Sequence, residues 1–259
     1  MMNPLRNIVS QGASEGWVAS PGGISFHEAR NVIGSSFAGS QDGSKLGEPF
    51  TEWFLEYMDF VSDEQRSDTT SFIMGVPIYE IFGKGAMAFG KKENGVLTSC
   101  AMVVEYDSSN TRNLLSRMAK KWRDTMAVAK MASGGIPDLF TKKEWKARKD
   151  HFMKIIELVD DSTKKWHAQY GPKGKHWHVA HIAVHPDHRG KGAGKALMAR
   201  LNAASDACGM ACYLECVGDR NKAFYEKMGY TWMGSGTLVD PVDSSREITC
   251  NFMLRHPIT

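Results

Sequence analysis

Several features that define other classes of protein are scarce in this sequence. No apolar run approaches the roughly 20 residues needed to cross a bilayer, and the first residues hold no continuous apolar core of a signal peptide. The five cysteines include no C-x-x-C pair and have no histidines at zinc-finger spacing, which argues against a disulfide framework and a structural zinc site. The formal net charge of +3 is far from the basic excess of nucleic-acid-binding proteins. We therefore expect a cytoplasmic protein without membrane or nucleic-acid partners, acting as a monomer or homodimer.

One stretch, from His176 to Leu197, combines a strand pattern, a proline, a glycine-rich basic loop and the start of a helix. The apolar positions Val179, Ile182 and Val184 predict a strand. This strand ends at Pro186, because proline has no N–H to donate to a β-ladder. The stretch is therefore expected to present a loop at the end of a strand, directly before a helix.

The loop itself, RGKGAGK, is suited to an anion with several charges. Its glycines, Gly190, Gly192 and Gly194, leave successive backbone N–H groups free to turn toward one ligand. The following helix adds its unpaired N–H groups and the positive end of its dipole. Positive charge comes from the side chains of Arg189, Lys191 and Lys195. A diphosphate is the ligand that this pattern favours.

The glycine spacing distinguishes this loop from two common nucleotide-binding loops. It does not fit the dinucleotide pattern G-x-G-x-x-G, and a Walker loop would need glycine in place of Arg189 and Ser or Thr in place of Ala196. The order Arg189-x-x-Gly192-x-Gly194 after a strand instead resembles the acyl-CoA loop of the GNAT superfamily of N-acetyltransferases. A second block, from Asn221 to Tyr230, is similar to the same superfamily and lies at the right distance.

The resemblance implies a fold class as well as a ligand. We expect a mixed α/β (α+β) fold of the GNAT type, in which a central, mostly antiparallel twisted sheet is splayed at the cofactor strand and flanked by helices. Extra helices are expected in the N-terminal part. We treat residues 1–259 as a single domain, with acceptor-shaping helices in 1–175 and the acetyl-CoA-binding and catalytic part in 176–259.

Local patterns predict most of the remaining elements. Ser25 and Glu28 form a capping box that predicts a helix to about Phe37. Asn94-Gly95 predicts a hairpin between two strands. Helical spacing is present in 50–60, 69–82, 113–130 and 142–166, in the segment that Gly209 ends, and in 221–229. Further strands are expected at 17–19, 211–217, 230–232 and 246–254.

Within the C-terminal third, the likeness is greatest to puromycin acetyltransferase and its relatives, through Tyr213-Leu214-Glu215 and Phe224 to Tyr230. That family uses acetyl-CoA without a metal and transfers the acetyl group directly to an amine in a ternary complex. The resemblance implies that the backbone of one strand holds the pantetheine arm and that the loop amides hold the diphosphate. The expected cofactor-binding residues are Ile182, Ala183, Val184, Arg189, Gly190, Lys191, Gly192, Ala193, Gly194, Lys195 and Asn221.

Direct transfer needs an acid for the leaving thiolate and a base for the acceptor ammonium. By resemblance, Tyr225 is the acid. The base stays open among Glu215, His178, His181 and water, because a carboxylate in a cleft and a histidine both suit the role. His176 shares a strand face with His178, but no carboxylate or cysteine lies at a suitable spacing, so no metal site is expected.

The function that these observations favour is acetylation of a primary amine in a small molecule, with the aromatic residues of 50–60, Trp17 and Trp145 as possible walls of an apolar acceptor pocket. Two alternatives stay open. One is acetylation of protein lysines or N-termini, against which the basic helices argue mildly. The other is an acyl-CoA-binding protein of the same fold without turnover.

Overall fold

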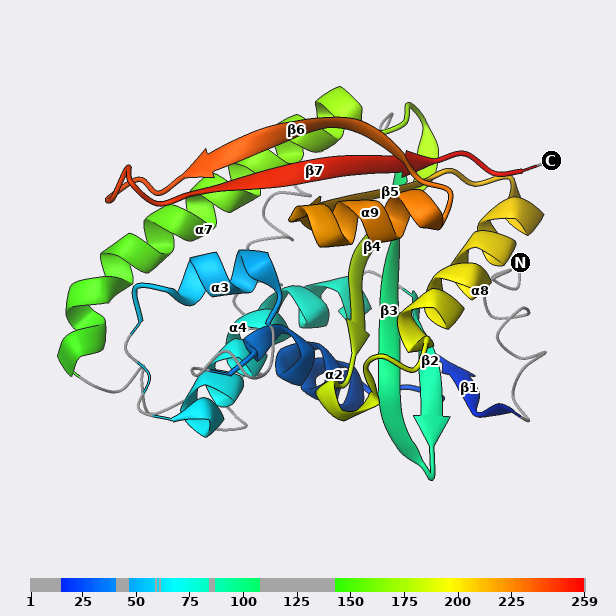
Figure 1. The fold of residues 1–259 in the computed structure, drawn as a ribbon, viewed down its shortest axis with the longest axis horizontal. Coiled ribbons are helices and arrows are strands. Elements are labelled where there is room, and N and C mark those ends of the chain that lie inside the picture. The colour runs from blue at the N-terminus through cyan, green and yellow to red at the C-terminus, as the bar shows by residue number, and fades with distance from the viewer. Residues whose placement is uncertain are drawn as a thin grey trace.

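A single sheet of seven strands organises the structure, a computed structural model that describes residues 15–40, 47–58, 60, 62–83, 87–107 and 143–258. The strand order is β1-β2-β3-β4-β5-β7-β6, and every neighbouring pair is antiparallel except β4 and β5 (Figure 1). The strands are β1 (Trp17–Ala19), β2 (Met87–Glu93), β3 (Val96–Asp107), β4 (Lys175–Val184), β5 (Cys212–Val217), β6 (Thr231–Val239) and β7 (Glu247–Arg255). The expected mixed α/β fold with a mostly antiparallel sheet is confirmed.

Helices in the described ranges lie on both faces of the sheet (Figure 1). They are α2 (Phe26–Ala38), α3 (Pro49–Leu55), α4 (Asp63–Gly83), α7 (Lys143–Tyr170), α8 (Ala193–Cys208) and α9 (Asp219–Lys227), with a 3-10 turn, η2, at Pro186–His188. None of these helices combines the length and apolarity needed to cross a membrane.

Most of the local predictions are confirmed. Ser25 caps α2 by accepting a hydrogen bond from the Glu28 N–H at 3.2 Å, and the Glu28 carboxylate accepts one from the Ser25 N–H at 2.8 Å. The hairpin turns at Asn94, which has φ 51°. The helix expected over 50–60 ends at Leu55, and the helix expected over 142–166 continues to Tyr170. The helix expected over 113–130 lies outside the described residues.

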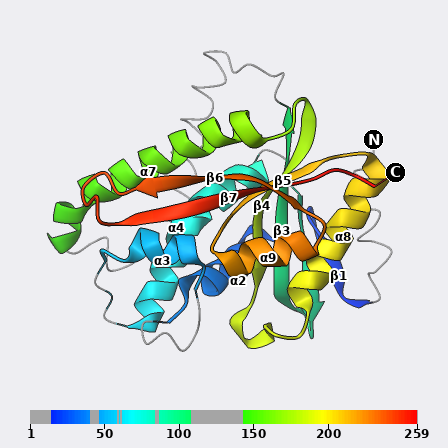
Figure 2. The ribbon, with the colours of Figure 1, turned by 45° about the horizontal axis from the view of Figure 1, so that its top comes forward.

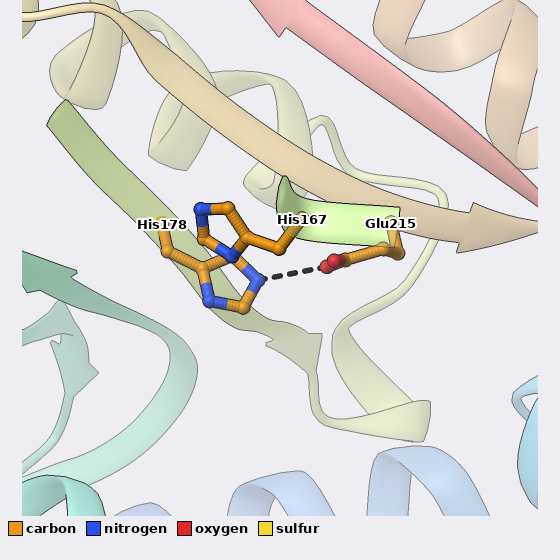
Figure 3. A group of neighbouring side chains, drawn as sticks. All are labelled: His167, His178 and Glu215. Carbon is orange, nitrogen blue, oxygen red and sulfur yellow. Dashed lines mark hydrogen bonds and ion pairs between the residues drawn. The ribbon is translucent and has the colours of Figure 1, made fainter. Parts of the chain in front are cut away.

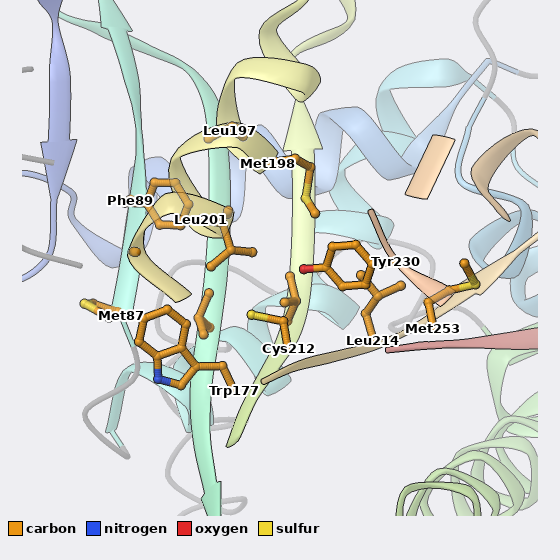
Figure 4. Packing of buried hydrophobic residues seen from close by; sticks show 14 of the residues in the cluster. Met87, Phe89, Trp177, Leu197, Met198, Leu201, Cys212, Leu214, Tyr230 and Met253 are labelled. Carbon is orange, nitrogen blue, oxygen red and sulfur yellow. The ribbon is translucent and has the colours of Figure 1, made fainter. Parts of the chain in front are cut away.

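One face of the sheet is covered by α8, with α9 beside it. Four buried residues of α8, Leu197, Met198, Leu201 and Ala204, pack against apolar side chains of β2 to β5 (Figure 4). Trp17 belongs to this core, and Arg200 of α8 lies over its ring at 4.2 Å. Trp17 therefore packs against α8 and not on the face that α7 covers.

The other face is covered by α2 and α4 at one end and by α3 and α7 at the other. Figure 2 shows α7 running alongside β6 and β7. This close approach depends on a glycine, because a Cβ built on Gly236 of β6 would lie 2.5 Å from ring atoms of Trp166 in α7. The indole ring also packs on Phe252 at 5.1 Å between centroids. Trp53 and Phe54 of α3 are buried in this core, so they serve packing rather than an open pocket.

The parallel pair β4 and β5 is joined over a short length only. Trp177 pairs with Cys212 and His178 with Tyr213, and beyond these residues the strands diverge. On its other side β4 keeps pairing with β3 as far as Val184. One edge of β4 beyond His178 therefore has no partner strand in the described structure, and its backbone groups face the divergence.

A β-bulge in β4 lies just past that point. Met102 of β3 pairs with His181, whereas the next residue, Val103, pairs with Val179, so Ala180 is an extra residue on β4. The bulge reverses the alternation of the strand. Before it, odd-numbered residues face α8, and after it the even-numbered Ile182 packs against that core.

Candidate active site

The glycine-rich loop lies exposed at the start of α8. Gly190 and Gly192 have φ of 76° and 80°, a conformation that side chains rarely adopt. A Cβ at either position would meet nothing within 4 Å, so glycine is needed there for its backbone angle and not for space. The first backbone hydrogen bond of α8 is donated by the Ala196 N–H to the Gly192 carbonyl, at 3.0 Å. The three preceding N–H groups have no acceptor within the helix and are available to an anion.

Arg189 anchors this loop. Its guanidinium donates to the backbone carbonyl of Ser36 in α2, to the Ser36 hydroxyl at 3.2 Å and to the Val184 carbonyl at 3.4 Å. Burial, and then the neighbouring charge of Arg220, lower the pKa of this arginine. Arg189, which was expected to bind the cofactor, thus connects β4, the loop and α2. The side chains of Lys191 and Lys195 are exposed.

Asn221, the other expected cofactor contact, lies in the first turn of α9. Its Nδ2 donates to the Val217 carbonyl at the end of β5, at 2.9 Å. This bond ties the start of α9 to the strand that carries Glu215. The structure therefore shows Asn221 as a link between two elements that border the β4–β5 divergence.

His178 and Glu215 meet where β4 and β5 begin to diverge (Figure 3). The Nε2 of His178 and the Oε2 of Glu215 are 2.7 Å apart, and the two side chains are 26% and 18% exposed. Burial lowers the pKa of His178, but the charge and hydrogen bond of Glu215 outweigh it and raise the pKa overall. Burial likewise raises the pKa of Glu215, and His178 more than offsets this. The structure thus joins two of the candidate bases in one charge-assisted hydrogen bond.

His167, in the last turn of α7, borders this pair, and sequence analysis did not single it out (Figure 3). Its ring lies 5.0 Å from the His178 ring and 4.6 Å from the Tyr213 ring, between centroids. Burial, and after it His178, lower its pKa to about 4, so the imidazole is neutral at pH 7. The helix was expected to end at Trp166, one residue before it. The feature of the sequence that could have indicated His167 was its position at the end of a long predicted helix.

His181 has a different environment. Its ring lies 5.9 Å from Phe37 of α2, and its Nδ1 is buried without a hydrogen-bond partner among the described residues. Burial, and then the charge of His178, lower its pKa to about 4. No carboxylate among the described residues forms a hydrogen bond with the His181 ring, whereas Glu215 forms one with His178. Of the histidines weighed as bases, His178 has the better-supported geometry.

Tyr225 lies in α9 and packs against the core on the α8 face. Its ring lies 5.2 Å from Phe224 and 5.9 Å from Tyr230. Burial raises its pKa above the ordinary value, and Cys216 and then Glu48 add to the shift. A phenol with a raised pKa keeps its proton at pH 7, so the Tyr225 hydroxyl is present as a proton donor, although the raised pKa makes it a weaker acid.

The acid and base candidates lie on opposite faces of β5. Tyr213 belongs to the core under α3 and α7, and Glu215 follows it by two residues. Leu214 and Cys216 belong to the core under α8, as Tyr225 does. Since side chains alternate along a strand, the sheet separates Glu215 from Tyr225 except where β4 and β5 diverge. Glu48, the N-cap of α3, is a further carboxylate near this region that sequence analysis did not single out.

Comparisons with known proteins agree with this architecture. Residues 154–232 match the family model described as acetyltransferase (GNAT) domain. The structure of a histone acetyltransferase HPA2 and related acetyltransferase from Corynebacterium glutamicum matches with a TM-score of 0.50 at 16% identity, covering 94% of this chain and 98% of that one. That of arylalkylamine N-acetyltransferase 2 from Aedes aegypti matches with a TM-score of 0.50 at 13% identity, covering 93% and 98%. The likeness to puromycin acetyltransferases stays a prediction. The chain has the fold of GNAT acetyltransferases, and its residues 154–232 match the model of the GNAT domain.

Proposed function

We propose that this protein is an acetyl-CoA-dependent N-acetyltransferase that transfers the acetyl group directly to the primary amine of a small molecule. One observation carries the proposal. An exposed loop with unpaired N–H groups and the His178–Glu215 pair adjoin the same divergence of β4 and β5: the pair lies where the divergence begins, and the loop follows the end of β4 at Val184. A ligand with a diphosphate at one end and a thioester at the other has the chemistry to occupy both.

The unpaired edge of β4 suits the extended middle of such a ligand. Backbone groups of residues 182–184 on that edge can bond the amides of a pantetheine arm as a partner strand would. The diphosphate then binds the N–H groups of residues 193–195, with Gly190 and Gly192 shaping the loop. Lys191 and Lys195 add positive charge at the surface. The thioester is thereby directed toward the point where the strands separate.

The chemistry requires one proton removed and one supplied. His178, with Glu215 behind it, accepts a proton from the acceptor ammonium, so that the free amine attacks the thioester carbonyl. The C–S bond then breaks, and Tyr225 protonates the departing thiolate. Because the base and the acid lie on opposite faces of the sheet, the amine approaches from the α7 face and the thiol leaves on the α8 face.

The surroundings of the base favour an acceptor with aromatic or apolar character. Tyr106 stacks on His167 at 4.2 Å, and Tyr213 lies 5.8 Å from His178, between ring centroids. The matched Aedes protein is named for arylalkylamines and the Corynebacterium protein for histones. The rings around the base are the reason to prefer the first class of acceptor.

Thiol release from acetyl-CoA tests the proposal. The purified chain is supplied with acetyl-CoA and with phenethylamine, agmatine or a lysine-rich histone-tail peptide, beside a reaction without acceptor. We expect release to be fastest with phenethylamine and to require an acceptor. Fastest release with the peptide would support the protein-acetylating alternative instead. Acetyl-CoA binding without release for any amine would overturn the catalytic proposal and favour a binding protein.

A further inference from the structure

We propose that His167, His178 and Glu215 form a binding site for a divalent transition-metal ion of the zinc type, and that an ion bound there inhibits acetyl transfer. Each residue offers one ligand atom, and these atoms lie within 4.8 Å of one another. They come from α7, β4 and β5 and converge on one point (Figure 3). Two imidazoles and one carboxylate form a known zinc ligand set that leaves a fourth position open.

The surrounding hydrogen bonds leave His167 able to bind an ion. His176 donates from Nδ1 to the Gly174 carbonyl at 3.0 Å, so the neutral ring presents Nε2 as an acceptor. That nitrogen lies 2.7 Å from Nε2 of His167, which must therefore be the donor. The remaining nitrogen of His167, Nδ1, then carries no proton. A ring held in one tautomer by a second histidine is a typical arrangement for a metal ligand.

Glu215 provides an independent reason to expect a ligand. Its Oε2 bonds His178, but its Oε1 is buried and accepts no hydrogen bond from the described residues. The Tyr213 hydroxyl is near enough to lower the pKa of the carboxyl, yet within the described part of the chain it makes no hydrogen bond of good geometry. A buried carboxylate oxygen with a vacant lone pair is costly unless a cation or donor fills it.

Binding of an ion must displace a proton. His178 and Glu215 share a proton at 2.7 Å, whereas two ligands about 2.0–2.1 Å from a tetrahedral ion lie roughly 3.3 Å apart. The pair therefore opens slightly, the proton of His178 Nε2 leaves to solvent, and the vacated nitrogen binds the ion. Affinity for the ion should consequently fall as the pH is lowered.

Inhibition follows because an ion bound at Nε2 of His178 takes Glu215 away as the partner of that nitrogen, and its positive charge disfavours protonation of Nδ1, the nitrogen left to receive the proton of the acceptor ammonium. This second half of the inference rests on the proposed function, whereas binding of the ion does not. The two can be measured separately, since metal binding requires neither acetyl-CoA nor an amine.

The test is a titration of the metal-free full-length chain with cobalt(II) chloride, followed by calorimetry and visible absorption. We expect one Co²⁺ per chain, the intense visible bands of a four-coordinate ion, and hyperfine-shifted NMR signals from two imidazoles. His167→Asn and Glu215→Gln should each weaken binding by about tenfold or more. The matched control is His188→Asn, which removes a histidine whose Nδ1 lies 3.3 Å from Glu93 Oε2 at the other end of β4. It should bind Co²⁺ as the wild type does.

Several results would overturn the inference. Absence of stoichiometric binding to the wild type contradicts the site, and so does binding that His188→Asn weakens and His167→Asn does not. The wild-type NMR signals identify the ligands even if His167→Asn fails to fold. If Co²⁺ binds at these residues but leaves thiol release unchanged, the inhibitory role is wrong. If the metal-free chain releases no thiol with any amine, the proposed function fails and the cobalt titration still decides the site.

Discussion

The two faces of the sheet differ in the kind of protein group that each offers to a ligand. On the α8 face, backbone N–H groups of one continuous loop are exposed, and two glycines with positive φ shape them. On the α7 face, the groups are half-buried or buried side chains from three different elements, His167 of α7, His178 of β4 and Glu215 of β5. A backbone site depends on conformation, whereas a side-chain site depends on register and packing. Substitutions should therefore impair the two faces by different routes.

The largest effect is expected on the α7 face, from Glu215→Gln. The amide keeps the shape of the carboxylate but cannot hold a charge beside His178, so kcat should fall by about 10²- to 10⁴-fold. Affinity for acetyl-CoA should change little, because the loop is a separate structure. Steady-state thiol release and calorimetry with CoA measure the two quantities. The control is Glu226→Gln, an exposed carboxylate on α9 that is 3.6 Å from Lys222.

The pH profile sharpens this prediction. In the wild type Glu215 raises the pKa of His178 above its ordinary value, so kcat/KM should rise with pH as the pair loses its proton. Without the carboxylate charge, burial alone acts on His178 and lowers its pKa. The rising limb of the profile should therefore move to lower pH in Glu215→Gln. If Glu215→Gln had the kcat of the wild type, or if the rising limb of its pH profile moved to higher pH, the assignment of His178 and Glu215 as the base would be contradicted.

Tyr225→Phe should have the next largest effect and would link the two faces. Removing the hydroxyl leaves the thiolate without its acid, so kcat should fall roughly 10²-fold while the affinity for acetyl-CoA survives. Tyr230→Phe is the matched control, because that hydroxyl is buried with no hydrogen-bond partner among the residues that the structure describes, and its ring lies 5.9 Å from Tyr225. Equal turnover in both variants would exclude Tyr225 as the acid.

On the α8 face, Gly192→Val should weaken CoA binding by about tenfold, since a left-handed conformation costs a side chain about 1–2 kcal/mol. The valine can avoid this strain by turning the loop amides away from the ligand. Gly209→Val is the control, because Gly209 caps the other end of α8 with φ 64° and equally open surroundings. Both variants should lose stability to urea, but only Gly192→Val should lose affinity in calorimetry. Equal affinity in the two would show that the diphosphate binds elsewhere.

The loop could be predicted from the sequence because its elements are contiguous. Strand, glycines and helix start follow one another from residue 176 to 197, and the structure places α8 at Ala193 and a left-handed cap at Gly209. The capping box of α2 and the Asn94-Gly95 hairpin were predictable for the same reason. In each case the interacting residues are a few positions apart, so the local sequence pattern is enough to predict the interaction.

The side-chain cluster could be predicted only in part. The step from Val179 to Ile182 does not fit an alternating strand, and the bulge at Ala180 that explains it brings His178 and His181 to one face. His167 reaches the cluster because α7 packs along β6 and β7, an arrangement set by contacts such as Trp166 on Phe252. These are contacts between segments far apart in the chain, and no local pattern specifies them.

The smallest expected effect concerns the pH dependence of stability, which the buried histidines confer on the α7 and α2 face. His167 and His181 have pKa values lowered to about 4 in the folded protein, whereas an unfolded histidine titrates near pH 6.5. Between these pH values the unfolded chain binds protons that the folded chain does not, so stability falls as the pH is lowered through this window. His178, whose pKa is raised, acts in the opposite direction: its contribution is present below about pH 6.5 and is lost as the pH rises through the folded pKa.

His181→Gln should reduce this loss. The variant lacks one of the histidines that take up a proton on unfolding, so its free energy of unfolding should fall by about 2 kcal/mol less than that of the wild type between pH 6.5 and 4.5. Urea denaturation at several pH values measures the difference. His256→Gln, at an exposed position near the C-terminal end of β7, should keep the wild-type slope. If His181→Gln keeps that slope too, His181 is protonated in the folded protein and its burial does not confer the pH sensitivity of this face.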